Sequence, residues 1–326
     1  ITVMTMTTKN ETFTNLVLEG GGVKGFAYIG ALKAMNDLNK IDNVKRIIGT
    51  SVGSMFAVLA SLKFANDELD VACIEMFKES SQFNDSITRK SINLLEGLGI
   101  HSNESVYKCV NNCFKKKFQL DPHARPLTFS QLFDKTGIEL TIVGTCLTNR
   151  KVSFFNYINN PDMEVAKAVQ ISTAIPIFFT VIDWNSMQWC DGGVVENFAI
   201  NYYDLPGGTF NDQTLGFYLK SDDENPDKTY KINNIANLLE GIENIELDNN
   251  ISQSIIDFSK RNIIVINTGS ISPIDFGLSD ENKKFLIDNG YKQTIEFFNK
   301  LNFSNSMSDE NKPTTSIFSI VRSYFF

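Results

Sequence analysis

Two glycine-rich turns, each between a short apolar run and a helical pattern, constrain the fold of this 326-residue chain more than any other feature. The first turn follows Leu16–Leu18 and precedes Phe26–Leu38, whose apolar residues recur at helical spacing. The second follows Val44–Ile48 and precedes Met55–Phe64. Two strand–turn–helix units in about 50 residues favour an α/β fold with a parallel sheet.

The rest of the chain adds further strands and helices to these two units. Residues 65–130 have helical character and contain no strand-like run of note. The later strands are predicted at Glu139–Thr145, Lys151–Phe155, Gln188–Cys190, Leu215–Leu219 and Asn262–Thr268. The later helices are predicted at Asp162–Ile171, after Pro161, and at Ser279–Lys300, with Ser279 as N-cap.

Charge and hydropathy narrow the class of partner and the compartment. The formal net charge of -8 repels phosphates, so we expect no nucleic-acid partner. The longest uncharged stretch, Ala168–Ile182, is too short for a membrane span and contains Pro176. The chain opens without the basic and apolar regions of a signal peptide, which predicts a cytoplasmic or intracellular protein. Its five cysteines have no framework spacing and are predicted to be reduced thiols.

The second turn carries the G-x-S-x-G pattern, with Gly49 and Gly53 on either side of Ser51. Between a strand and a helix, this pattern is typical of a nucleophile elbow, a strained turn that exposes the serine hydroxyl. The glycines let the strand and the helix pack closely around the turn. The competing interpretation is a glycine-rich turn with a serine that caps the helix.

A nucleophilic serine needs a base, and the positions of the histidines exclude the usual one. His101 and His123 are the only histidines, and none follows them. In α/β-hydrolases the triad runs Ser, Asp or Glu, and then His along the chain. An acid between Ser51 and either histidine would have to come from a short stretch, so a carboxylate is the better base for Ser51.

Asp191 is the candidate carboxylate, because it ends a short apolar run and precedes Gly192 and Gly193. That run predicts a strand, which would present the carboxylate at its end, and the glycines allow close backbone approach. The competing interpretation is a hairpin turn, for which Asp-Gly is a strong signal.

The first turn, Gly20–Gly25, supplies backbone amides at the start of a helix, where an oxyanion can bind. It also matches the G-x-G-x-x-G fingerprint of dinucleotide-binding proteins. That fingerprint expects an acid at the end of the second strand, where this chain has Gly49, Thr50 and Ser51. The phosphate-binding Walker pattern fails too, because Gly25 is followed by Phe26 and not by Lys.

Together these elements resemble the patatin-like phospholipase family over roughly Leu16 to Lys300. A fourth block, Ser172–Phe179, looks like the small-residue and proline segment that precedes the aspartate in that family. The residues that support the resemblance, besides the site residues, are Lys24, Gly25, Gly49, Gly53, Pro176, Gly192 and Gly193. The resemblance implies a three-layer α/β/α sandwich with a mostly parallel central sheet.

The resemblance also implies an activity, which is the hydrolysis of acyl esters of lipids, often phospholipids, through a Ser-Asp dyad and an acyl-enzyme. Ser51 would be the nucleophile, Asp191 the base, and Gly20, Gly21 and Gly22 the oxyanion hole. No cofactor or metal is implied.

The implied domain covers residues 16–300, between an N-terminal extension at 1–15 and a C-terminal tail at 301–326. Residues 65–130 would be its helical segment near the active site. The partner would be a lipid or phospholipid, and Phe114–Phe118, with three lysines, is a candidate for transient contact with a membrane surface. A solvated helix face is the competing interpretation of that run. Two alternative functions remain, a nucleotide-binding protein that uses Gly20–Gly25 and a catalytically silent lipid-binding module.

Overall fold

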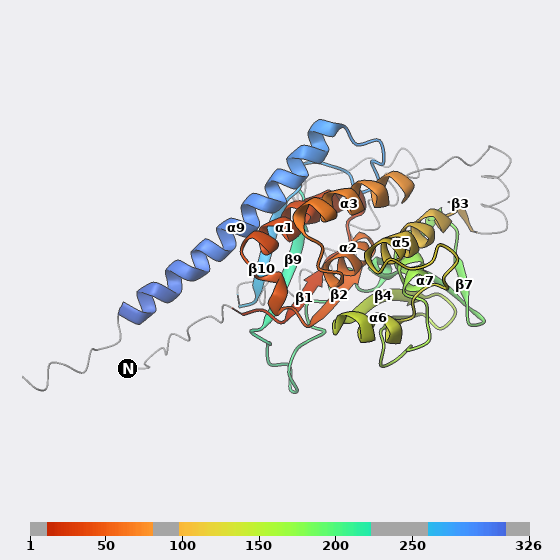
Figure 1. Cartoon of the computed structure of the whole chain (residues 1–326), viewed down its shortest axis with the longest axis horizontal. Coiled ribbons are helices and arrows are strands. Elements are labelled where there is room, and N and C mark those ends of the chain that lie inside the picture. Colours follow the sequence, from red (N-terminus) through yellow and green to blue (C-terminus); the bar gives the residue numbers. More distant parts are fainter. Residues whose placement is uncertain (1–11, 81–97, 223–259, 311–326) are drawn as a thin grey trace, which may run out of the picture.

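An eight-stranded sheet runs through the computed structural model, which describes residues 12–80, 98–222 and 260–310 (Figure 1). Its strands are β1 (Asn15–Leu18), β2 (Arg46–Thr50), β4 (Glu139–Cys146), β5 (Lys151–Phe155), β7 (Ile182–Trp184), β8 (Met187–Asp191), β9 (Thr214–Lys220) and β10 (Asn262–Asn267). The strand order is β10-β9-β1-β2-β4-β8-β7, and β5 pairs with β4. The strands from β10 to β4 are parallel, whereas β5, β7 and β8 pair in antiparallel fashion.

Helices pack on this sheet and on one another. The described α-helices are α1 (Phe26–Asp37), α2 (Val52–Ser61), α3 (Asn66–Ser80), α5 (Glu104–Lys117), α6 (Phe129–Thr136), α7 (Val165–Ser172) and α9 (Asp280–Glu310). The long helix α9 lies along α1 and extends past the sheet (Figure 1). Their backbones approach closely, because a Cβ on Gly30 would lie 1.9 Å from the Ile287 carbonyl oxygen, and one on Gly290 equally close to that of Ala27.

The two faces of the sheet bury different amounts of apolar surface. Leu16 and Ile47 belong to the large core that the helices cover, while Val17 and Ile48 point to the other face, as alternation along a strand requires. Among the described residues, the second face is packed by Ala199, Ile200 and Tyr203, which lie between β8 and β9. The predicted α/β fold with a mostly parallel central sheet and flanking helices is confirmed.

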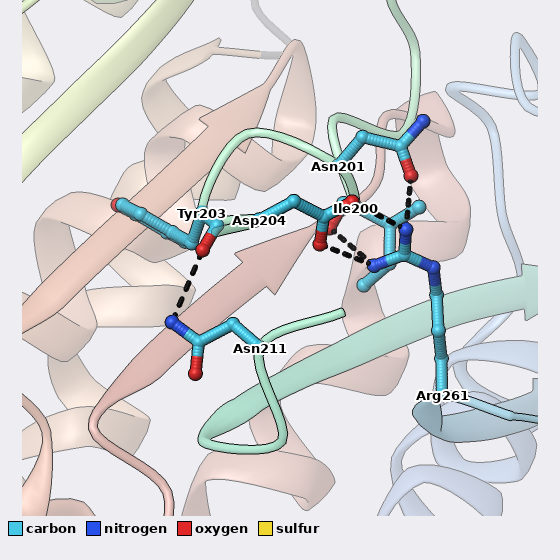
Figure 2. A network of polar contacts seen from close by, with 6 residues as sticks. All are labelled: Ile200, Asn201, Tyr203, Asp204, Asn211 and Arg261. Carbon is cyan, nitrogen blue, oxygen red and sulfur yellow. Dashed lines mark hydrogen bonds and ion pairs between the residues drawn. The ribbon is translucent and has the colours of Figure 1, made fainter. Parts of the chain in front are cut away.

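A buried ion pair ties that connection to the start of β10 (Figure 2). Arg261 donates to both carboxylate oxygens of Asp204, at 2.8 and 2.6 Å, and to the Asn201 side chain at 2.6 Å. It also donates to the Ile200 carbonyl at 3.2 Å. A bidentate arginine–carboxylate pair combines strength with directional specificity, so it holds the connection against the edge of the sheet.

Most of the predicted elements are present, with shifts at their ends. Helix α2 begins at Val52, directly after Ser51, because the turn itself starts the helix. Helix α7 begins at Val165 rather than Asp162, and α9 continues beyond Lys300 to Glu310. Ser279 does cap α9, since its hydroxyl oxygen accepts the Asn282 N–H at 3.2 Å.

The prediction that residues 65–130 contain no strand is wrong. Strand β3 (Gly99–His101) pairs in parallel with β6 (Ile177–Phe179) in a separate two-stranded sheet. Three residues are too few to show an alternating pattern, and their pairing comes from a partner far along the chain. All five cysteines are buried thiols. Within the described ranges, no helix combines the length and the apolar character that a membrane span requires.

Candidate active site

Ser51 occupies a strained turn between β2 and α2. Its backbone has φ 49° and ψ -125°, a combination that is costly for a residue with a side chain and is concentrated at functional sites. The turn is possible because its glycines leave room: a Cβ on Gly49 would lie 2.3 Å from the Gly53 carbonyl oxygen, and one on Gly53 2.4 Å from that of Leu18. The predicted elbow geometry is therefore present.

Strand pairing along β4 brings Asp191 to Ser51. The last residue of β2, Thr50, lies opposite Val143, and the last residue of β8, Asp191, lies opposite the next residue, Gly144. Because β5 pairs with the overlapping part of β4 on its other edge, β2 and β8 share one edge. Since they run in opposite directions there, their C-terminal ends meet head to head.

The two side chains are joined by a hydrogen bond in a buried setting. The Ser51 hydroxyl donates to Asp191 Oδ2 at 2.6 Å, and the Gly193 N–H donates to Asp191 Oδ1 at 2.7 Å. Ser51 is 6% exposed and Asp191 4%. The length of the bond is typical of a hydroxyl donating to an ionised carboxylate. Gly192 lets the backbone after Asp191 approach β4 closely, because a Cβ there would lie 2.5 Å from the Val143 carbonyl oxygen.

The segment that precedes Pro176 accepts backbone hydrogen bonds from both Ser51 and Asp191. Ser172, the last residue of α7, accepts the Ser51 N–H on its hydroxyl at 2.9 Å. The Ala174 carbonyl accepts the Asp191 N–H at 2.9 Å. Sequence reasoning quoted this block only as a marker of the family, whereas the structure gives two of its residues contacts to Ser51 and Asp191.

The Gly20–Gly25 loop lies directly against Ser51, since a Cβ on Gly20 would be 3.2 Å from the Ser51 Cβ. The Gly20 N–H donates to the Asn197 carbonyl at 3.1 Å. The N–H groups of Gly21 and Gly22 have no hydrogen-bond partner within the part of the chain that the structure describes. Two backbone donors without a partner among the described residues are thus present on the loop that contacts Ser51.

The rest of this loop is held by packing and by one remote contact. Lys24 and Gly25 are buried in a short 3-10 helix, and a Cβ on Gly25 would lie 2.3 Å from the Val52 side chain. The next amide, that of Val23, donates to the Pro273 carbonyl at 2.8 Å. Gly22 has φ +52°, and a Cβ there would lie 1.9 Å from that same Pro273 oxygen, so only glycine fits.

A buried carboxylate lies immediately before the loop. Glu19 is 2% exposed, and its carboxylate accepts the Leu219 N–H at 2.6 Å and the Asn197 side-chain amide at 3.4 Å. The Tyr28 hydroxyl donates to the Glu19 backbone carbonyl at 2.8 Å. Burial, and to a lesser degree the Glu19 charge, raise the pKa of Tyr28 well above its usual value. Sequence reasoning singled out neither Glu19 nor Asn197.

An apolar cavity of about 450 Å³ opens onto Ser51. Its lining residues are Gly22, Val23, Phe26, Ser51, Val52, Met55, Ile74, Phe77, Val106, Thr173, Ile175, Phe179, Phe276, Leu278, Asp280 and Lys283. Helices α3 and α5 of the 65–130 segment contribute three of them. The charged pair Asp280 and Lys283, 2.8 Å apart and at the start of α9, adds charged groups to a wall whose other side chains are mostly apolar. The size and character are those of a small-molecule or acyl-chain pocket.

Neither histidine lies in this wall. His101 is buried on β3, with its ring 5.1 Å from that of Phe178, and His123 is on the exposed connection after α5. Among residues 12–80, 98–222 and 260–310, no three Asp, Glu, His or Cys side chains are grouped as metal ligands would be.

Relatives of this chain occur among viruses. Protein R571 of Acanthamoeba polyphaga mimivirus is 30% identical over 294 residues, which cover 88% of this chain and 94% of that protein. The probable lipid hydrolase 463L of Invertebrate iridescent virus 6 is 29% identical over 198 residues, which cover 59% of this chain and 64% of that protein.

The fold also matches a solved structure, that of VipD from Legionella pneumophila. The TM-score is 0.54 at 18% identity, over 89% of this chain and 67% of VipD. A family model, that of the patatin-like phospholipases, matches residues 16–203, which is more than half of the chain and includes both Ser51 and Asp191. The chain therefore belongs to the patatin-like phospholipase family.

Proposed function

We propose that this protein is a lipid acyl hydrolase in which Ser51 attacks the ester and Asp191 moves the proton. The observation that carries the proposal is the 2.6 Å hydrogen bond from the Ser51 hydroxyl to Asp191 Oδ2, at a strained turn that opens onto an apolar cavity. The name of the iridescent virus relative, a probable lipid hydrolase, supports a lipid substrate.

The proposed reaction has two halves. Ser51 Oγ bonds to the ester carbonyl carbon while its proton passes to Asp191, and the tetrahedral oxyanion then expels the alcohol, which takes that proton. The product is an acyl-enzyme on Ser51. Water next gives a proton to Asp191 and attacks the acyl carbon; the fatty acid leaves, and Ser51 Oγ recovers the proton.

A carboxylate is a weak base for a hydroxyl, because the usual pKa of aspartate is about 3.9. Stabilisation of the oxyanion must therefore lower much of the barrier. Removal of one donor from an oxyanion hole typically costs about 3 kcal/mol of transition-state stabilisation. We assign this role to the N–H groups of Gly21 and Gly22, which have no other partner in the described residues.

Two other N–H groups near Ser51, those of Gly20 and Val52, are further candidate donors. The Gly20 N–H is engaged by the Asn197 carbonyl, so we propose that Gly20 serves by letting the loop approach Ser51. Val52, the residue after the nucleophile, is the first residue of α2, and its N–H has no partner among the described residues. Its position matches the donor found in other nucleophile elbows, and sequence reasoning did not include it.

We assign the acyl chain to the apolar cavity, with the lipid head group at its mouth. The substrate class is a lipid ester, of which phospholipids are the proposed main members, met in transient contact with a membrane surface. Lys116 and Lys117 of α5 form ion pairs with Glu75 and Glu68 of α3, so these carboxylates neutralise part of the charge that the lysine run would offer to a membrane surface. No cofactor enters the proposed reaction.

A fluorophosphonate probe with an alkyl chain tests the proposal, because it reacts only with an activated serine. We expect stoichiometric labelling of Ser51, and loss of both labelling and ester hydrolysis in Ser51→Ala with unchanged thermal unfolding. A nucleotide retained without labelling would favour a nucleotide-binding protein. Lipid binding without labelling or turnover would favour a silent lipid-binding module.

A further inference from the structure

We propose that Asn197 and Glu19 form a positioning pair that holds the oxyanion loop at a defined distance from the segment that presents Asp191. The proposal rests on the proposed function, because it assigns the pair to the same site. Neither residue touches the reacting atoms. Both act through the glycines beside them, Gly20 on one loop and Gly193 on the other.

The side chain of Asn197 lies between the two loops. A Cβ on Gly20 would be 2.2 Å from Asn197 Oδ1, and one on Gly193 would be 2.9 Å from the same atom. The Asn197 backbone carbonyl also accepts the Gly20 N–H at 3.1 Å. Asn197 is 6% exposed, so no bulk water separates these contacts. One residue therefore sets the spacing between the proposed oxyanion donors and the proposed base.

Glu19 determines which way the Asn197 amide points. A carboxylate only accepts hydrogen bonds, so the Asn197 NH₂ group must face it, at 3.4 Å, and Oδ1 must face the glycines. The other Glu19 oxygen accepts the Leu219 N–H of β9 at 2.6 Å, which anchors the pair to the sheet. Burying a carboxylate until it is 2% exposed costs free energy, and a neutral residue would fill the same space at a smaller cost in free energy.

Exchanging donor and acceptor across the pair tests the proposal. Asn197→Asp places two carboxylates against each other, and Glu19→Gln places an NH₂ group at Asn197 or at the Leu219 N–H. The double variant Glu19→Gln with Asn197→Asp restores the bond within the pair and the bond to Leu219: the introduced amide NH₂ donates to the introduced carboxylate, and the amide oxygen accepts the Leu219 N–H. One carboxylate and the net charge are kept, while the carboxylate moves to position 197 and the hydrogen bond within the pair changes direction.

We expect kcat for a soluble short-chain ester to fall about 10²-fold in Asn197→Asp with little change in KM, because misplacement by about 1 Å costs that much. The double variant should recover about tenfold or more of this loss, as coupled pairs do. Asn262 is the matched control, being also 6% exposed, with its amide donating to the Asp212 carbonyl at 2.9 Å. Asn262→Asp should lower the unfolding temperature but keep kcat per folded molecule.

The outcomes separate this proposal from the proposed function. A wild-type protein that neither hydrolyses esters nor reacts with the fluorophosphonate would overturn the proposed function, and the pair with it. An active wild type whose Asn197→Asp variant keeps its kcat, or a double variant with no recovery, would overturn the pair alone. If Asn197→Asp does not fold, Asn197→Ser supplies the same comparison, because its short hydroxyl cannot reach both Glu19 and the glycines.

Discussion

The proposed site draws on two parts of the chain that differ in how far sequence patterns reveal them. Residues 16–203, which the family model matches, contain Ser51, Asp191 and the Gly20–Gly25 loop. Residues beyond 203 contribute β9, β10 and α9 and four residues of the cavity wall, which are Phe276, Leu278, Asp280 and Lys283. The proposed chemistry lies in the first part, whereas the surface that would meet the acyl chain comes from both.

The two parts differ in how far sequence patterns reveal them for a physical reason. Proton transfer and oxyanion binding require particular atoms within hydrogen-bond distance, which restricts the residues at a few positions. An apolar wall requires only shape and hydrophobicity, so many residues serve equally. The two parts nevertheless share a sheet and several hydrogen bonds, and one of these reaches the loop itself, where the Pro273 carbonyl accepts the Val23 N–H at 2.8 Å. The second part thereby helps to hold the loop that we assign to the oxyanion.

Asp191→Asn should have the largest effect and fall entirely on the chemistry. We expect kcat to fall by at least about 10²–10⁴-fold, because the substitution removes the proposed proton acceptor while keeping size and shape. Stability should change little, since an Asn oxygen still accepts the Gly193 N–H. Ester turnover and thermal unfolding measured on the same sample check this. Near-normal turnover would assign Asp191 to the turn alone.

Gly22→Ala should come next, because it disturbs the contact between the loop and Pro273 of the second part. The added Cβ would meet the Pro273 carbonyl oxygen at 1.9 Å, so the loop must move and carry the proposed donors with it. We expect a loss of about 10²–10³-fold in kcat. Gly137 is the control, since its φ of +66° is similar but nothing lies within 4 Å of the added Cβ.

Gly137→Ala should cost only the left-handed strain, about 1–2 kcal/mol of unfolding free energy, and leave kcat intact. Equal losses of kcat in the two glycine variants would mean that the φ angle, rather than the Pro273 contact, sets the loop.

Phe276→Ala should have a smaller effect, and one that depends on the substrate. The ring lines the cavity and stacks on Phe178 at 4.9 Å, so its removal shortens the apolar wall. We expect kcat/KM to fall about tenfold for long-chain esters and to stay unchanged for acetyl or butyryl esters. Phe77, which lines the cavity from the matched part and stacks on Phe26 at 3.9 Å, allows a direct comparison.

If Phe77→Ala alters chain-length preference and Phe276→Ala does not, the Phe276 ring has no share in selectivity. A uniform loss for all esters in Phe276→Ala would instead show that this ring supports the chemistry.

The sequence was most informative where chemistry restricts residue choice. The elbow at Ser51 was predictable from the G-x-S-x-G pattern between strand and helix, and a carboxylate base such as Asp191 was predictable because no histidine follows residue 123. What the sequence did not reveal depends on long-range pairing. The Gly20 N–H is taken by the Asn197 carbonyl, and Ser172 accepts the Ser51 N–H, and no local pattern indicates either bond.

The residues of the cavity wall could not be predicted from the sequence for a different reason. Phe276 and Leu278 lie in the connection between β10 and α9, where no helical or strand periodicity indicates which face is buried. Strand β3, within the 65–130 segment, escaped prediction because its three residues acquire their conformation by pairing with β6. This segment also contains both histidines, so it offers the most demanding test of the dyad.

His101→Gln combined with His123→Gln should have the smallest effect, leaving kcat within about threefold of wild type, because neither residue is a proposed general base. The Ser51 hydroxyl already donates to Asp191 at 2.6 Å, and neither ring lines the cavity. His101 is 9% exposed and packs on Phe178, so the double variant should lose some stability, and turnover must be scaled to the folded fraction. A loss above about a hundredfold in a folded variant would exceed any packing effect and match the removal of a general base. That result would place a histidine in the reaction and overturn the two-residue mechanism, whatever Asp191→Asn shows.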